Sequence, residues 1–326
     1  MWDYNFSSII GLMRKTFPFL VFRFTIYAAI TLISVAITGG GAGLGWLGGF
    51  LLGDAAKGAG YGGLLGASGS FYFLYVVREY LLYQVKAGHI ALLVKFMDGE
   101  PVPEGQGMVV YAKDQVKKHF VQSNILFLVD QSIKGVLKVI SRLFSSVANI
   151  LPIPGLQMFV TVVGKIVSMS LTYVDEIILA YHMKNSSGNV WGNSCKGLVL
   201  YTMNYHKMLK NAFWLTLLVW VLMIFVFILV FGPVVAIVSV FPSLAGFWTF
   251  AVAGIITWGI KSAVIDPIAM TALMQVYFKA VEGQVPNPEM EQKLESMSDK
   301  FRSMKEKSAA EASAGISNFR PFVATK

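Results

Sequence analysis

Residues 212–231 read AFWLTLLVWVLMIFVFILVF, the most hydrophobic run in the chain. The run carries no charged residue, and about 20 apolar residues are what an α-helix needs to cross the hydrocarbon core of a bilayer. The polar pair Lys210 and Asn211 precedes the run, and Gly232 and Pro233 are expected to loosen its end. This stretch therefore predicts a transmembrane helix.

The composition extends this prediction to the whole chain. Of its 326 residues, 55% are hydrophobic and only 14% are charged, and the mean hydropathy is +0.61. A soluble domain has roughly 25% charged residues. The net charge of +9 does not indicate a nucleic-acid binder, because basic residues that face a cytoplasmic leaflet give the same total. We expect an all-α, polytopic membrane protein whose partners are lipids and not nucleic acid.

Further apolar segments cover residues 18–38, 61–83 and about 244–265. Two more, at 124–151 and 155–181, are long and apolar but contain charged residues. If both of these cross the membrane, the chain has about six spans. If they instead form a re-entrant or interfacial hairpin, it has four spans plus that hairpin. Hydropathy alone leaves both possibilities open.

The distribution of Lys and Arg predicts the orientation. With six spans, one set of alternate loops holds nearly all the basic residues, and the other set holds only Lys57. The positive-inside rule then places both termini in the cytoplasm. No cleaved signal peptide is expected, and a bacterial inner membrane suits this pattern. In order, the expected segments are an N-terminal cytoplasmic segment (1–17), the first helices (18–83) with a glycine-zipper hairpin (39–69), a basic cytoplasmic segment (84–123), a charged amphipathic hairpin (124–181), a cytoplasmic loop (182–211), the last two spans with a broken helix (212–285) and a charged cytoplasmic tail (286–326).

Glycine is concentrated in one region, where 14 of the 31 glycines lie between Gly39 and Gly69. Two series have a spacing of four residues, which places each series on one helix face. Small residues on one face let two backbones approach closely in lipid. The pattern predicts a helical hairpin that turns near residues 54–57, with the glycines as a packing or oligomerisation face; the alternative is a glycine-lined permeation path. The residues are Gly41, Gly45, Gly49, Gly53, Gly58, Gly62 and Gly66.

Charged residues recur every four positions at Asp130, Lys134, Lys138 and Arg142, with apolar residues between them. This pattern is typical of an interfacial helix whose basic stripe (Lys134, Lys138 and Arg142) reaches lipid headgroups. The alternative is a charged face that lines a water-filled cavity. The depth of the helix in the membrane would distinguish the two.

Other charges fall within or beside the apolar segments. Ionisable residues at membrane depth often mark a substrate pathway, although each of these could also anchor a helix at the interface. Asp175 and Glu176 are adjacent, so they point about 100° apart on a helix and at most one can serve a single ligand. The candidate pathway residues are Arg78, Glu79, Lys165, Asp175, Glu176, Lys261 and Asp266.

No catalytic or metal-binding motif is present in the sequence. The four histidines have no ligand spacing, the single cysteine cannot build a thiolate site, and no nucleophile elbow or nucleotide-binding loop occurs. We therefore expect no enzyme, no metal and no cofactor. In the tail, apolar residues from Met290 to Met304 repeat by three and four, which predicts a short cytoplasmic helix that docks on the bundle or on a partner.

The second half of the chain has a particular order of features. A long apolar helix precedes a polar stretch (Asn193, Ser194, Cys195 and Lys196), and an amphipathic helix then ends at Lys210 and Asn211, before two strong spans. A helix broken by an acid follows (264–281, with Asp266), and then a charged helix (300–307). From about Pro154 to Ala310 this layout resembles the choline transporter-like family. The first half does not share it.

The resemblance implies transport of a choline-like cation or a lipid headgroup precursor. From the residues themselves we expect a protein for transport or permeation of a small organic solute. The alternative is a non-transporting membrane scaffold or accessory subunit that binds lipid or a cytoplasmic partner through its basic loops and tail. In that case the glycines mediate assembly as a homo-oligomer or with a membrane partner.

Overall fold

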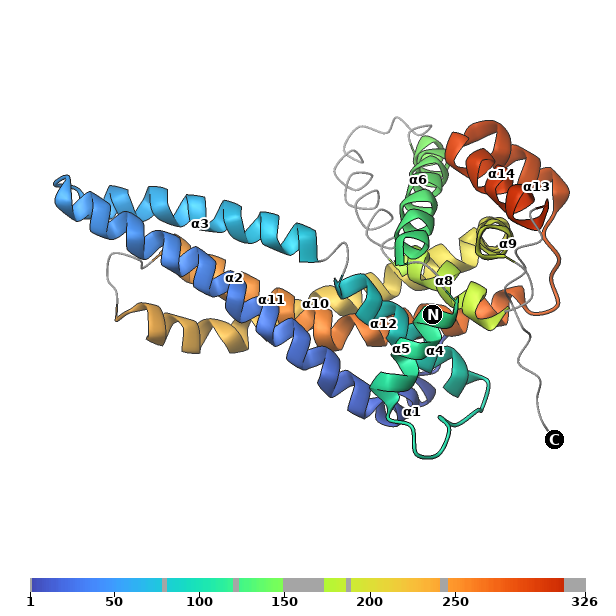
Figure 1. Cartoon of the computed structure of the whole chain (residues 1–326), viewed down its shortest axis with the longest axis horizontal. Coiled ribbons are helices and arrows are strands. Elements are labelled where there is room, and N and C mark those ends of the chain that lie inside the picture. Colours follow the sequence, from blue (N-terminus) through green and yellow to red (C-terminus); the bar gives the residue numbers. More distant parts are fainter. Residues whose placement is uncertain are drawn as a thin grey trace. The chain divides into compact units, whose positions relative to one another are not determined.

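The structure is a computed structural model that describes residues 2–77, 81–119, 123–148, 173–185, 189–240 and 246–313. Within these ranges every regular element is a helix (Figure 1). The chain divides into two compact units. The first comprises Met1–Thr16, Lys86–Leu217 and Ala269–Lys326, and the second comprises Phe17–Val85 and Leu218–Ile268.

The helices have the following bounds in chain order: α1 (Phe6–Lys15), α2 (Phe17–Leu51), α3 (Ala55–Val77), α4 (Tyr83–Met97), α5 (Met108–His119), α6 (Ser123–Ala148), α8 (Val174–Lys184), α9 (Val190–Met203), α10 (Tyr205–Val238), α11 (Phe247–Ile260), the π-helical turn η4 (Lys261–Ile265), α12 (Asp266–Val281), α13 (Pro288–Met297) and α14 (Asp299–Ser313).

Among the described residues, three helical stretches are long and apolar enough to cross a membrane. They are Phe17–Leu51, Tyr205–Val238 and Phe247–Val281, and we call them the candidate spans. With 34 or 35 residues, each would be about 50 Å long at 1.5 Å per residue, which exceeds the hydrocarbon thickness. The described part of the chain is thus all-helical, and its three candidate spans indicate a membrane protein. The larger number of spans stays a prediction, and much of the expected 124–181 hairpin lies outside the described residues.

Two helices are longer than hydropathy predicts. The first apolar segment does not end at Thr38, because α2 continues through the glycine run to Leu51. Three of its glycines, Gly41, Gly45 and Gly49, face the backbone of the next helix or of the turn before it, and this contact offsets the conformational freedom that glycine loses in a helix. Likewise α10 does not end at Gly232, since it passes Pro233 and continues to Val238.

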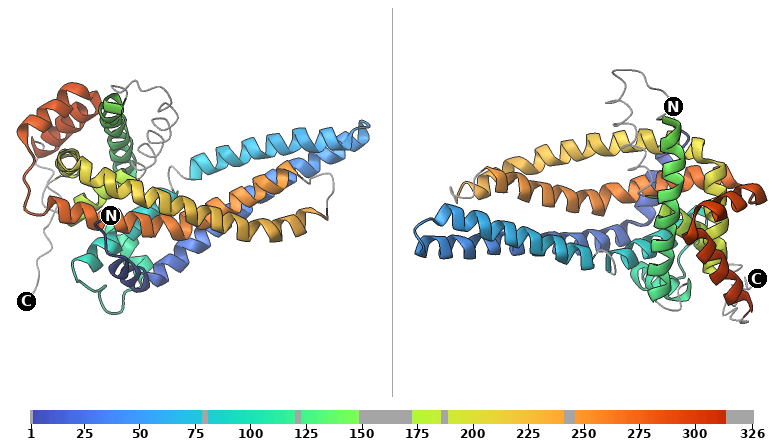
Figure 2. Two further views of the ribbon diagram at one scale, coloured as in Figure 1. Left: turned by 180° about the vertical axis from the view of Figure 1, so that it is seen from behind. Right: turned by 90° about the horizontal axis from the view of Figure 1, so that it is seen from above.

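In the second unit, α2 and α3 form an antiparallel hairpin, and all views show them side by side (Figures 1 and 2). The connection covers residues 52–54, and Gly53 has a φ of +89°, a conformation that a side chain disfavours. Helix α11 also packs on α2, with Gly259 against Thr31. Trp248 of α11 lies against Gly63 of α3.

In the first unit, α8 is largely buried, and every residue from Val174 to Ala180 belongs to the buried interior. Helices α6, α9 and α14 pack around this region. The expected tail helix is two helices, because Ser298 is extended and its hydroxyl caps α14 by accepting the Phe301 N–H at 3.3 Å. Phe301 and Met304 are fully buried and dock α14 on this unit, whereas Met297 is 40% exposed.

Candidate functional site

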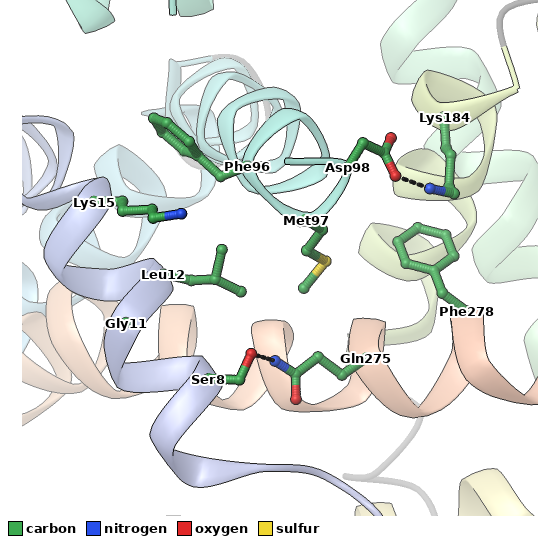
Figure 3. A pocket seen from close by; sticks show the side chains of 10 residues that line it. All are labelled: Ser8, Gly11, Leu12, Lys15, Phe96, Met97, Asp98, Lys184, Gln275 and Phe278. Carbon is green, nitrogen blue, oxygen red and sulfur yellow. Dashed lines mark hydrogen bonds and ion pairs between the residues drawn. The ribbon is translucent and has the colours of Figure 1, made fainter. Parts of the chain in front are cut away.

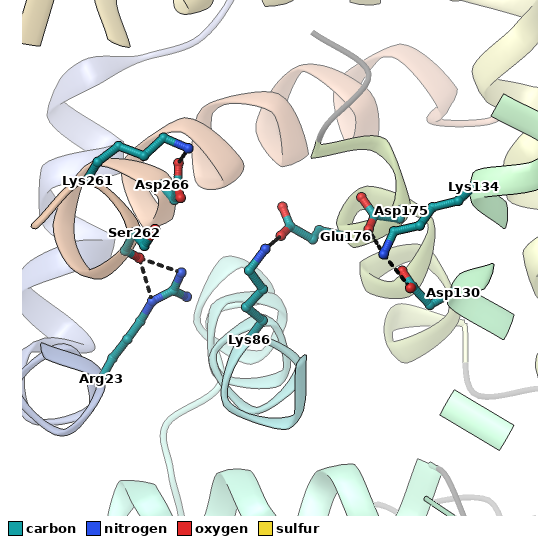
Figure 4. Close-up of polar contacts among 9 residues, drawn as sticks. All are labelled: Arg23, Lys86, Asp130, Lys134, Asp175, Glu176, Lys261, Ser262 and Asp266. Carbon is teal, nitrogen blue, oxygen red and sulfur yellow. Dashed lines mark hydrogen bonds and ion pairs between the residues drawn. The ribbon is translucent and has the colours of Figure 1, made fainter. Parts of the chain in front are cut away.

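Buried charged residues gather at the start of α8 in the first unit (Figure 4). Asp175 and Glu176 occupy the first turn of this helix, where carboxylates interact favourably with the helix dipole. Both are buried, with 6% and 2% of their surface exposed. Because adjacent helical residues point in different directions, each carboxyl meets a different cation.

Glu176 pairs with Lys86 of α4, and their Oε1 and Nζ atoms are 2.5 Å apart. The Glu176 side chain is 3% exposed and that of Lys86 is 23% exposed. An ion pair that is shielded from water to this degree depends on both partners, since removing one leaves the other charge poorly solvated. This pair fixes α4 against α8.

Asp175 belongs to a second group, with Asp130 and Lys134 of α6 (Figure 4). The Nζ atom of Lys134 lies 2.5 Å from Asp130 Oδ2 and 3.8 Å from Asp175 Oδ2. Burial is the main reason that the pKa of Asp175 rises to about 7, and the negative charge of Asp130 adds to it, while Lys86 and Lys134 oppose the rise. The Asp175 carboxyl can therefore hold a proton near neutral pH.

The Oδ1 atom of Asp130 is consistent with that protonation. It is buried, and no donor reaches it in the described part of the chain. A proton on Asp175 would supply the donor, because a protonated carboxyl can donate to a neighbouring carboxylate. We call Asp130, Lys134 and Asp175 the carboxyl cluster.

The basic stripe of α6 is thus divided among different environments. Lys134 turns towards the two acids of the carboxyl cluster instead of standing free for lipid headgroups, because it neutralises carboxylates that are themselves buried. Lys138 is exposed. Arg142 belongs to α6, but its side chain lies outside the described part of the structure.

A second polar group occurs in the second unit, within two of the candidate spans. Arg23 of α2 is 1% exposed and donates from Nε (3.2 Å) and Nη2 (2.9 Å) to the carbonyl oxygen of Ser262 (Figure 4). Its guanidinium also lies 5.4 Å from the centre of the Tyr27 ring. Lys261 and Asp266 form an ion pair at 2.8 Å. We call Arg23, Lys261, Ser262 and Asp266 the span polar group.

The π-helical turn η4 explains why the span polar group forms at this position. Pro267 has no backbone N–H, so it cannot donate to the carbonyl four residues earlier, and the regular helix pattern is interrupted there. The N–H of Asp266 donates to the carbonyl of Lys261, five residues back. Such π turns are frequent at functional sites, because they change the direction of side chains and carbonyls.

The glycines of the hairpin face each other closely. A Cβ atom on Gly45 would lie 2.7 Å from the Cα atom of Gly62, and one on Gly49 would lie 2.8 Å from the Cα atom of Gly58. A side chain on either glycine would force the helices apart. Gly41, Gly62 and Gly66 have similar backbone neighbours, whereas Gly53 lies in the turn with open space around it.

The structure places the expected pathway residues in separate groups. Asp175 and Glu176 belong to the first unit, and Lys261 and Asp266 belong to the second. Arg78, Glu79 and Lys165 lie outside the described residues. In the described ranges, no three His, Cys, Asp or Glu side chains gather as they would around a metal ion.

Sequence patterns did not identify Lys86 and Arg23 as site residues. Lys86 lies in a basic segment of the sequence, and nothing distinguishes it from the neighbouring lysines until its partner Glu176, 90 residues away, is known. Arg23 interrupts the first apolar segment, and this interruption was the available signal.

No protein-family model matches this chain, and neither a curated protein nor a solved structure matches it.

Proposed function

We propose that this chain is an integral membrane protein that transports a small organic solute, with the span polar group on its pathway. The observation that carries the proposal is Arg23, which is buried within a candidate span and bound to a carbonyl at a π turn. A charge at membrane depth is costly, and such residues most often serve a pathway for ions or substrates. No catalysis, metal or cofactor is part of the proposal.

The span polar group holds charges of both signs, with Arg23 and Lys261 positive and Asp266 negative. The resemblance to the choline transporter-like family makes choline the first substrate to test. Glycine betaine, which keeps the trimethylammonium group of choline and adds a carboxylate, is tested beside it.

The proposal also includes the orientation of the chain in the membrane. The basic residues of the cytoplasmic segments support cytoplasmic termini in a bacterial inner membrane. The second candidate function is a non-transporting scaffold or accessory subunit. It is favoured by the hairpin, whose outward side chains Leu44, Leu51 and Leu65 are each at least 73% exposed and suit a lipid or membrane-protein partner.

The deciding experiment is uptake into proteoliposomes of phosphatidylethanolamine and phosphatidylglycerol that contain the purified full chain. Radiolabelled glycine betaine and choline are supplied with and without a proton gradient. We expect uptake above empty liposomes. Arg23→Met should abolish it, and Arg23→Lys, which keeps the charge but loses the fork of donors, should reduce it.

The matched control is Arg302→Met, which removes an arginine on α14, outside the candidate spans. Its uptake should equal that of the unmodified chain. Melting in detergent checks that each variant is folded. If the folded chain gives no uptake of either solute, the scaffold function replaces the transport function.

A further inference from the structure

An open cavity of about 490 Å³ lies within the first unit, bordered by α1, α4, α8 and α12 (Figure 3). This volume falls in the range of small-molecule sites. One part of its wall is apolar and includes Phe96, Met97 and Phe278. The rest is polar and includes Lys15 and Gln275.

Most polar groups of the wall already have partners that hold them in place. The Gln275 amide donates to the Ser8 hydroxyl at 3.0 Å and accepts the Asn5 N–H at 3.3 Å. Lys184 forms an ion pair with Asp98, and its ammonium lies 5.4 Å from the centre of the Phe278 ring. The charges of Lys184 and Asp98 therefore cancel within the wall.

Lys15 is different. It is exposed, its Nζ atom lies 6.0 Å from the centre of the Phe96 ring, and Figure 3 shows the side chain reaching into the cavity. Among the described residues no carboxylate pairs with it. Its neighbour Arg14 also lies in the last turn of α1 and can interact with the helix dipole. The cavity thus has one uncompensated positive charge beside an apolar surface.

We propose that this cavity binds a small organic acid, whose single oxyanion group meets Lys15 and whose apolar body, preferably aromatic, packs on Phe96 and Phe278. A charge-assisted hydrogen bond gives the site its preference for an anion. The aromatic rings give it area to bury, and they favour a flat apolar group. The oxyanion can belong to a free carboxylate or to the phosphodiester of a lipid headgroup. This binding site is separate from the span polar group and does not depend on transport.

The experiment is calorimetric titration of the full chain in an uncharged detergent, with three probes that share one body. These are 3-phenylpropanoate, the neutral 3-phenylpropanamide and 3-phenylpropylammonium. We expect the carboxylate to bind at least about tenfold more tightly than the amide, a difference of about 1.4 kcal/mol, and the ammonium to bind most weakly. Equal affinity for all three probes would overturn the proposal.

Two variants of adjacent residues test the assignment. Lys15→Met keeps most of the length of the side chain and removes its charge, and it should lower the affinity for 3-phenylpropanoate about tenfold. Arg14→Met removes the same charge from the same helical turn, but Arg14 does not line the cavity, and its effect should be less than about twofold. If both variants weaken binding equally, the probe is attracted by the overall positive charge of this end of α1. The assignment of the binding site to the cavity at Lys15 would then be wrong.

A competition experiment identifies the source of the oxyanion. Dihexanoyl phosphatidylglycerol, below its micellar concentration, should displace 3-phenylpropanoate if the cavity accepts lipid headgroups. If it fails to displace the probe, the site belongs to free organic acids. Because binding is measured at equilibrium without a gradient, a failure of the proposed transport would not change these results, and a failure of binding would not affect uptake.

Discussion

Two helix contacts in this molecule are held together in opposite ways. In the glycine-rich part of the hairpin, α2 and α3 touch through backbone atoms, because the glycines between them have no side chains to contribute. At the start of α8, the contacts with α4 and α6 run through charged side chains, with Lys86 on Glu176 and Lys134 between Asp130 and Asp175. The hairpin contact depends on the absence of side chains between the helices. The α8 contacts depend on particular charged groups.

This difference determines what each contact tolerates. The hairpin has no titratable group between its helices, so it should be insensitive to pH and very sensitive to volume. The contacts of α8 should tolerate a change of volume better than a change of charge, because their stability comes from compensation between buried ions. Steric and electrostatic substitutions can therefore break the two contacts separately.

The largest effect is expected for Gly45→Leu. The first atom of the new side chain would overlap the carbonyl oxygen of Gly58 and lie 2.7 Å from the Cα atom of Gly62. Both are backbone atoms and cannot move without separating the helices. We expect a loss of about 3 kcal/mol or more in the free energy of unfolding, seen as a lower melting temperature and a lower yield in detergent.

The matched control is Gly43→Leu, on the same helix. A Cβ atom at Gly43 meets nothing within 4 Å, so the added side chain points into open space. Its melting temperature should stay close to that of the unmodified chain. Equal destabilisation by both substitutions would show that the hairpin is not held by this glycine face.

The next effect is expected for Lys86→Met. It keeps most of the side-chain volume but removes the ammonium from Glu176, whose side chain is 3% exposed. A loss of about 3 kcal/mol in the free energy of unfolding should follow. Arg302→Met breaks a pair with Asp299, which is 95% exposed, and should have no measurable effect on melting. Similar losses in both variants would argue against a role for burial at the α8 contact.

Hydropathy located the three candidate spans, because a long apolar run is a local property of the sequence. It did not find where these helices end. Helix α2 continues past Thr38 since the other half of the hairpin covers its glycines, and α10 passes Pro233. Helix ends of this kind depend on neighbours that a sliding window does not include.

The sequence also did not predict which residues form polar contacts with one another. The spacing of Asp130 and Lys134 predicted one helix face, but it did not show that Asp175, 45 residues later, would share the same lysine. Arg23 and Ser262 are 239 residues apart. Long-range pairs follow from the packing of whole helices, and periodicity along one helix carries no information about the residue opposite.

The pH dependence of stability should also distinguish the hairpin from the contacts of α8, although the expected effect is smaller than those of Gly45→Leu and Lys86→Met. Burial and Asp130 raise the pKa of Asp175 to about 7, so the folded chain holds this proton more tightly than the unfolded chain. The stability contributed by this proton is complete below pH 4 and is lost as the pH rises towards 7. Melting temperature should therefore fall across this range.

Asp175→Asn removes the titrating group but keeps a side chain that can donate to Asp130. Its melting temperature should depend less on pH, and around pH 7 to 8 it should equal or exceed that of the unmodified chain. The charged groups that face Asp175 are Lys86 of α4 and Asp130 and Lys134 of α6, and all three remain. An unchanged pH profile would mean that the carboxyl cluster does not hold the proton in the folded chain.

The smallest and most local effect concerns Cys195 of α9, a helix that packs on α8. The charged groups nearest to its thiol are Glu291 and Glu295 of α13 and Lys305 of α14, so Cys195 reports whether water is excluded between α9 and the tail helices. Its side chain is buried, and burial raises the pKa of the thiol to about 12. The reactive thiolate is thus rare at neutral pH.

Maleimide labelling at pH 7 should be slower in the folded chain than in denaturant by at least about two orders of magnitude. Fast labelling of the unmodified chain would instead show that water reaches this side of α9.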